Sequence, residues 1–175
     1  MPKPLKYLSH YPESLQKQVQ ALMTHGKLES YLLKKYPLAH NYKTDKALFN
    51  YAIELKNSYM KKTSPLSKVH FDGKINVINN ALGTHHYISR VQGSKLKAKN
   101  EIRIATLFKH VPEAFLAMIV VHELAHFKEK EHSKAFYKLC EHMESNYHQY
   151  EFDLRIYLTL MDSGRKLWKK ENEDG

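Results

Sequence analysis

The chain has 175 residues, of which 42% are hydrophobic, and this is enough for one compact domain with a core. Its single cysteine, Cys140, excludes an intramolecular disulfide, and the absence of a signal peptide or membrane span in the sequence leads us to expect a cytoplasmic protein. The net charge of +10 favours anionic partners.

The first third of the chain shows helical periodicity. Apolar residues keep helical spacing over residues 15–23 and again over residues 28–33, where Pro37 closes the second segment. A third helix is predicted over residues 48–59, with Thr44 as its N-cap. These stripes are typical of core-facing helices, and we assign them no chemistry.

A small sheet is predicted in the middle of the chain. Residues 69–78 have the pattern of a hairpin, with Asp72-Gly73 in the favoured two-residue turn. Residues 87–91 and 101–106 are predicted as two further strands. We therefore expect a small, mainly antiparallel sheet before the next helix.

A long apolar run then leads into the sequence His122-Glu123-Leu124-Ala125-His126. Because the run is apolar on every face and starts after Pro112, we predict a buried helix from residue 112 to about 129. Residues four apart share one face of a helix, so the two histidines can bind one small cation. Glu123, beside the first of them, can act as general base toward a metal-activated water.

Helix geometry constrains the third ligand. If the helix continued, His132 would lie about 9 Å beyond the second histidine along the axis and could not reach the same ion. Residues 128–131 are polar and suited to a turn, and Ser133 is a good N-cap for a following helix. His132 can then return toward the metal, while Glu151 and Asp153 stay open as alternative third ligands.

These motifs together resemble a known family. The motif at residues 122–126, five intervening residues and then His132-Ser133-Lys134-Ala135-Phe136-Tyr137 are similar to the pattern of the YgjP-like metallopeptidase-domain family, a relative of the SprT-like and WLM zinc proteases. The resemblance to an enterobacterial member extends over nearly the whole chain. The further matching segments are residues 42–48, 89–93 and 147–153.

The resemblance implies an α+β, zincin-like single domain with a buried active-site helix between N-terminal and C-terminal helices. It also implies a zinc ion, or another divalent metal, held by His122, His126 and His132, with Glu123 as the catalytic base. The family name suggests a metallopeptidase, but a family member has been assigned hydrolysis of UTP to UMP and pyrophosphate. A peptidase is therefore the first hypothesis and a nucleoside triphosphate (UTP) pyrophosphatase the alternative. A nucleic-acid-associated module with structural zinc is the second alternative, although a structural site would not need Glu123.

Substrate contacts are expected outside this motif. A basic segment just before the zinc helix is either a solvated surface or a contact for nucleotide phosphates or a nucleic-acid backbone. Its basic residues are Arg90, Lys95, Lys97, Lys99 and Arg103. The candidate substrate or oxyanion contacts are Arg90, Arg103, Tyr147 and His148.

We expect one compact domain. Residues 1–66 would form its N-terminal helical part, residues 67–168 its metallohydrolase core, and residues 169–175 a flexible tail. A last helix through Phe152, Ile156 and Leu160 is predicted to end at Gly164.

Overall fold

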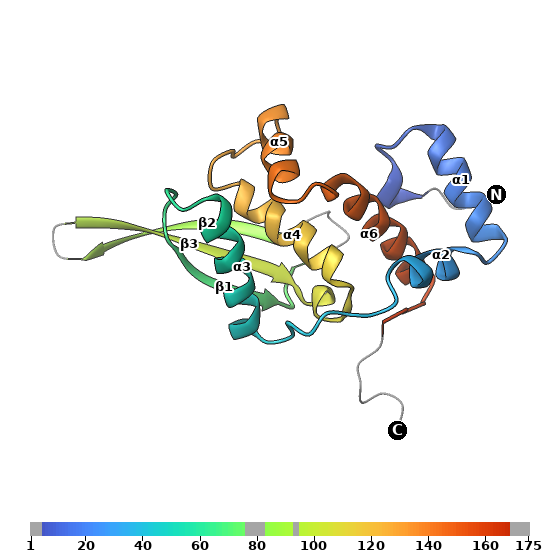
Figure 1. The fold of residues 1–175 in the computed structure, drawn as a ribbon, viewed down its shortest axis with the longest axis horizontal. Helices are drawn as coiled ribbons and strands as arrows, with labels where there is room; N and C mark the ends of the chain where they lie inside the picture. Colours follow the sequence, from blue (N-terminus) through green and yellow to red (C-terminus); the bar gives the residue numbers. More distant parts are fainter. Residues whose placement is uncertain (1–4, 76–82, 93–94, 169–175) are drawn as a thin grey trace, which may run out of the picture.

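The computed structural model describes residues 5–75, 83–92 and 95–168, without the side chains of residues 83–92 and 95–99. The proposed tail at residues 169–175 lies outside the described residues. The architecture is α+β, as predicted, and Figure 1 shows the elements along the chain. In chain order they are α1 (Glu13–Thr24), α2 (Leu28–Lys35), α3 (Asp45–Tyr59), β1 (Leu66–Asp72), β2 (Gly83–Gln92), β3 (Lys95–Ala105), α4 (Glu113–Ala125), α5 (Lys134–Met143) and α6 (Tyr147–Asp162).

The predicted helices of the first third are confirmed, and local signals set their ends. Thr44 caps α3, because its hydroxyl accepts a hydrogen bond from the backbone N–H of Ala47 at 3.1 Å. Gly26 follows α1 with a φ of +66°, a left-handed conformation that glycine adopts without strain. Among the described residues, no helix is both long enough and apolar enough to span a membrane.

The sheet is mixed, not mainly antiparallel. Its strand order is β1-β3-β2, with β2 and β3 antiparallel and β1 and β3 parallel. The predicted turn at Asp72-Gly73 is present, and the Asp72 carboxylate accepts from the Lys74 N–H at 2.8 Å. However, β1 pairs with β3, and the expected second hairpin strand at residues 76–78 lies outside the described residues.

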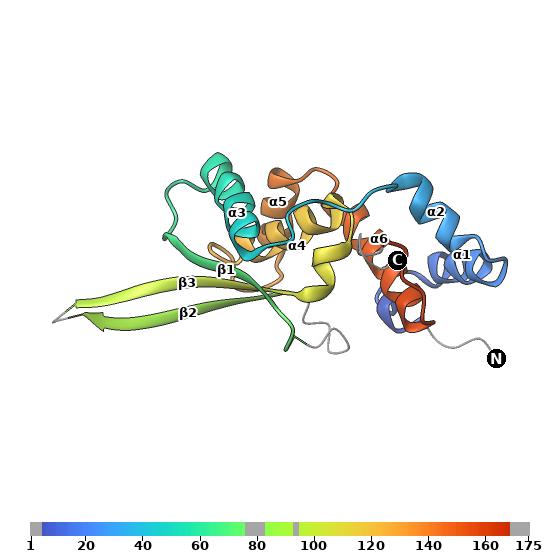
Figure 2. The ribbon, with the colours of Figure 1, turned by 90° about the horizontal axis from the view of Figure 1, so that it is seen from below.

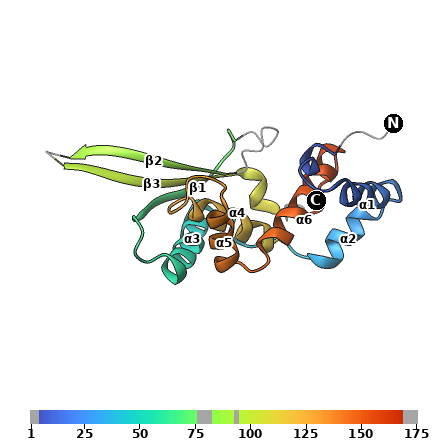
Figure 3. The same cartoon turned by 90° about the horizontal axis from the view of Figure 1, so that it is seen from above.

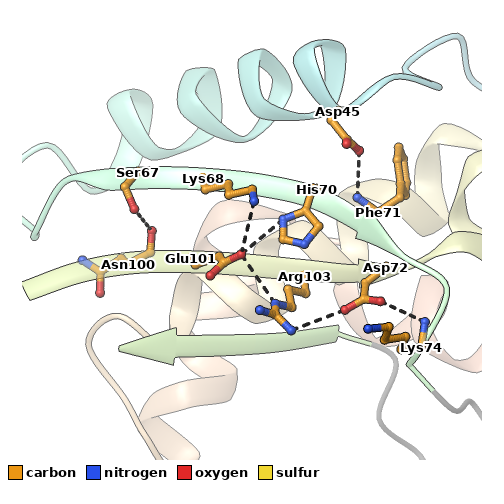
Figure 4. Close-up of polar contacts among 10 residues, drawn as sticks. All are labelled: Asp45, Ser67, Lys68, His70, Phe71, Asp72, Lys74, Asn100, Glu101 and Arg103. Carbon is orange, nitrogen blue, oxygen red and sulfur yellow. Dashed lines mark hydrogen bonds and ion pairs between the residues drawn. The ribbon is translucent and has the colours of Figure 1, made fainter. Parts of the chain in front are cut away.

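The two faces of the sheet differ in chemistry, which explains the pairing of β1 with β3. Val69 and Phe71 from β1 and Ile102 and Ile104 from β3 are buried in one core, and pairing the strands joins them into one apolar face. Helices α3, α4 and α5 lie on that side, and no described helix covers the other side (Figures 2 and 3). We call this other side the open face. Its described side chains on β1 and β3 are Lys68, His70, Asp72, Glu101 and Arg103 (Figure 4).

Helix α4 lies at the centre of the molecule, and almost all of its side chains are buried. It ends at Ala125, about one turn before the predicted end near residue 129. The chain then turns, with the Phe127 N–H donating to the Leu124 carbonyl and the Lys128 N–H to the Ala125 carbonyl. The predicted helix break before His132 is therefore present, and it occurs earlier than expected.

Candidate metal centre

The helix break brings three histidines together. His122 and His126 come from the end of α4, and His132 comes from the loop before α5. Their candidate ligand atoms all lie within 4.8 Å of one another. The Nε2 atoms of His126 and His132 are 3.2 Å apart. Two nitrogens bound to one tetrahedral zinc ion at 2.0–2.1 Å would be separated by about 3.3 Å, so this spacing fits a shared metal.

The predicted cap of α5 orients the chain at His132. The Ser133 hydroxyl accepts a hydrogen bond from the Phe136 N–H at 3.2 Å, which confirms Ser133 as the N-cap. His132 therefore sits immediately before a fixed helix start. An N-cap with extended backbone redirects the chain, and this places an otherwise distant histidine beside α4.

Hydrogen bonds to the remote ring nitrogens fix the orientation of two of the histidines. The Nδ1 of His126 lies 2.9 Å from the carbonyl oxygen of Glu129. Because a carbonyl oxygen only accepts, this Nδ1 carries the proton, and Nε2 keeps the lone pair that a metal requires. The Nδ1 of His122 lies 2.8 Å from the Tyr147 hydroxyl, whose oxygen can accept a hydrogen bond from this nitrogen in the same way. Both rings can thus present a free Nε2 to a cation.

The Phe136 ring packs against the rings of all three histidines. Its ring centroid lies 4.9 Å from that of His122, 4.6 Å from that of His126 and 5.0 Å from that of His132. Burial, together with the two neighbouring histidines, lowers the pKa of His122 to about 3. Burial also lowers the pKa of His126. These rings are therefore neutral at neutral pH, the state in which imidazole binds metal.

Glu123 is 2% exposed and lies beside the histidine cluster. Its Oε1 is 3.9 Å from the Nε2 of His122, and its Oε2 is buried with no hydrogen-bond partner among the described residues. Burial raises the pKa of this carboxyl to about 8. A buried carboxyl without a partner next to three neutral nitrogen donors fits a site built for a cation.

The alternative third ligands are engaged elsewhere. Glu151 pairs with Arg155, with 3.2 Å between its Oε1 and the arginine Nε. Asp153 is fully buried and accepts hydrogen bonds from the hydroxyls of Tyr31 and Tyr36, which tie α6 to α2. The geometry therefore favours His132 over both carboxylates.

The structure brings only one of the four candidate substrate contacts into the histidine cluster. Tyr147 is fully buried against His122, so it supports the ring and does not face a substrate. His148 is exposed and lies 2.7 Å from Glu141. Arg103 lies on the open face, away from α4, near Asp72. The side chain of Arg90 lies outside the described residues.

Sequence reasoning missed the supporting residues of this centre. Phe136 lies four residues after His132, and its helical spacing predicts a core position, but nothing local indicates that it packs under the histidines. The Glu129 carbonyl carries no sequence signal at all. Tyr137 belongs to the matching motif but was given no role, and its ring lies 6.4 Å from that of His132 and 5.6 Å from that of His148, at the edge of the site.

Two comparisons with known proteins bear on this centre. A family model described as YgjP-like, metallopeptidase domain matches residues 86–157, which include the three histidines and Glu123. The UTP pyrophosphatase of Escherichia coli (strain K12) is 56% identical over 161 residues, covering 92% of this chain and 96% of that protein. No solved structure matches the chain.

Proposed function

Because the chain belongs to the YgjP-like metallopeptidase-domain family and is a hydrolase, we propose that it is a metal-dependent pyrophosphatase that cleaves UTP to UMP and pyrophosphate. The observation that carries the proposal is the convergence of three histidines beside a buried, unpartnered Glu123. The named activity of the E. coli relative favours this substrate over the peptide that the family name first suggests.

We assign the metal to zinc, held by His122, His126 and His132. The donor set supports this choice, because three neutral imidazoles suit zinc, whereas magnesium and calcium prefer oxygen ligands. When bound there, zinc would lower the pKa of a water molecule toward 7 and polarise a phosphoryl oxygen. Tyr147, Glu129 and Phe136 would keep the ligand rings in place.

Glu123 would move the proton of the reaction. Hydrolysis forms one P–O bond from water to the α-phosphorus and breaks the bond from that phosphorus to the bridging oxygen, so one proton must leave the water. A cation held beside Glu123 would counter the effect of burial and favour the ionised carboxylate, whose Oε2 has no hydrogen-bond partner in the described residues and could then accept this proton. The carboxyl would then return the proton to the departing pyrophosphate.

A structural zinc site fits these observations less well. Structural sites are almost always closed by four protein ligands, whereas the cluster in the described part of the chain has three histidines. Burying Glu123 also carries a desolvation cost, which a purely structural site would have no reason to sustain. We therefore do not favour a module in which zinc only holds the fold together.

The test compares UTP with unfolded casein as substrates of the zinc-loaded protein. We expect UMP and pyrophosphate from UTP, and a kcat for Glu123→Gln that is lower by about 10²–10⁴-fold with zinc content unchanged. Glu131→Gln is the matched control, because Glu131 is an exposed acid in the same region, and it should keep the wild-type kcat. Cleavage of casein without UTP hydrolysis would replace the proposal with a peptidase. Full activity in Glu123→Gln would remove the assigned base.

A further inference from the structure

Strands β2 and β3 extend well past the helices. They pair in continuous register from Gly83 opposite Ile104 to Gln92 opposite Lys95. Figures 1 and 2 show the outer part of this pair projecting beyond α3, α4 and α5 as a narrow two-stranded ribbon. We call residues 88–92 and 95–99 the arm. At about 3.4 Å per residue, its strands project by roughly 17 Å.

The register places all four basic residues of the arm on one face. Residues directly opposite in an antiparallel pair share a face, and residues two apart along a strand share it too. Arg90 is opposite Lys97, while Lys95 and Lys99 lie two residues to either side of Lys97. This face continues through Glu101 and Arg103, so it is the open face. Residues 87–100 contain no aspartate or glutamate.

The part of the open face outside the arm, on β1 and the C-terminal end of β3, has balanced charges (Figure 4). The Glu101 carboxylate lies 4.0 Å from the Lys68 amine and 3.5 Å from the Arg103 Nε. The Arg103 Nη1 also lies 3.5 Å from the Asp72 carboxylate. Two cations there meet two anions, whereas the arm supplies four cations and no acid of its own.

The concentration of positive charge on one face should destabilise the arm when no anionic partner is bound to it. Like charges directly opposite each other on paired strands are destabilising. Arg90 and Lys97 are such a directly opposite pair. An anionic partner would offset the repulsion. The row from Lys95 to Lys99 extends over roughly 14 Å, which suits a polymer of repeated negative charges.

We propose that the basic face of the arm binds the phosphate backbone of double-stranded DNA. A two-stranded β-ribbon is an element that the major groove of B-DNA, about 12 Å wide, admits. The projection of the arm beyond the helices would let it approach a duplex without displacing other elements. This activity goes beyond nucleotide hydrolysis and does not depend on the metal centre.

The test measures binding of a labelled duplex of about 20 base pairs by fluorescence anisotropy between about 50 and 200 mM salt. The arm variant carries Lys95→Gln, Lys97→Gln and Lys99→Gln. The matched control removes the same charge from three exposed lysines near α1 and α2, at the end of the molecule away from the arm. Its substitutions are Lys17→Gln, Lys27→Gln and Lys34→Gln.

We expect the arm variant to reduce the slope of log K against log salt by about 2–3, because each lost phosphate contact removes about 0.9. The control should change the slope by less than about 1. Circular dichroism establishes that both variants are folded. Absence of duplex binding by the wild type would overturn the proposal, as would equal losses in the two variants. Tighter binding of the wild type to phosphatidylserine vesicles than to the duplex would overturn it as well.

Discussion

Replacing Tyr147 with phenylalanine tests how the metal centre is held. The hydroxyl of Tyr147 lies 2.8 Å from the Nδ1 of His122, and Tyr147 is fully buried, so water cannot readily replace the lost hydroxyl. Removing a hydrogen-bond partner of a metal-binding histidine typically lowers metal affinity about 10–100-fold. This corresponds to about 1.4–2.8 kcal/mol. It agrees with the cost of about 1–3 kcal/mol for leaving a buried polar atom unpaired.

The assay is competition for zinc between Tyr147→Phe and a chromophoric chelator at fixed pH. Tyr137→Phe is the matched control, since it removes a tyrosine hydroxyl at the edge of the same site without a hydrogen bond to a ligand ring. We expect the control to stay within about twofold of the wild type, a difference of less than 0.5 kcal/mol. An affinity of Tyr147→Phe equally close to wild type would refute the supporting role of the hydroxyl. Urea unfolding of the metal-free proteins separates this effect from a general loss of stability.

Three further predictions follow from the described contacts. His132→Ala should lose tight zinc binding in equilibrium dialysis, whereas His142→Ala, which removes an exposed histidine from α5, should not; equal retention would exclude His132 as a ligand. Asp153→Ala should lower the free energy of unfolding by about 3 kcal/mol in urea, because it leaves the buried Tyr36 hydroxyl without an acceptor and removes the ion-pair partner of Lys35. Asp162→Ala, on the same helix but half-exposed, should lower it far less, and similar losses would refute the assigned role of the buried carboxylate. Burial raises the pKa of the Cys140 thiol to about 12, so at neutral pH it should react with a thiol reagent only after unfolding; rapid labelling of the folded protein would contradict its burial.

Helix positions could be predicted because their signals are local. Thr44 and Ser133 each accept a hydrogen bond from a backbone N–H three residues later, and such caps can be recognised from a few neighbouring residues. The end of α4 was less predictable. The turn after Ala125 is held in part by the bond from His126 to the Glu129 carbonyl, and carbonyl groups have no sequence signature.

Sheet pairing depends on residues far apart in the chain, and this limited its prediction. The turn at Asp72-Gly73 was found, but a local turn signal does not determine which strand lies next to β1. Ile102 and Ile104 belong to the same core as Val69 and Phe71, and burying all four together places β3 beside β1. The sequence pattern favours pairing between strands that are neighbours in the chain. In the folded protein β1 pairs with β3 instead, and this buries a continuous apolar face.

The metal centre shows the same division between local and distant information. The convergence of its three histidines beside Glu123 could be predicted from spacing, since helix periodicity and a cap define where those side chains point. Tyr147 was considered only as a substrate contact. Its hydrogen bond with His122 depends on how α6 packs against α4, and no local sequence pattern near either residue predicts that contact.

The attacking group does not by itself determine the substrate of the proposed reaction, so the choice between a peptide and a nucleotide depends on other properties of the protein. A metal-activated water with a carboxylate base can attack a peptide carbonyl or a phosphoryl group. A chain with a net charge of +10 attracts a nucleoside triphosphate more strongly than a polypeptide of balanced charge, over distances of about 8–10 Å in physiological salt. In our proposal, the positive net charge of the chain therefore contributes to the preference for a nucleotide. This explains why a motif shared with peptidases is compatible with phosphoanhydride hydrolysis.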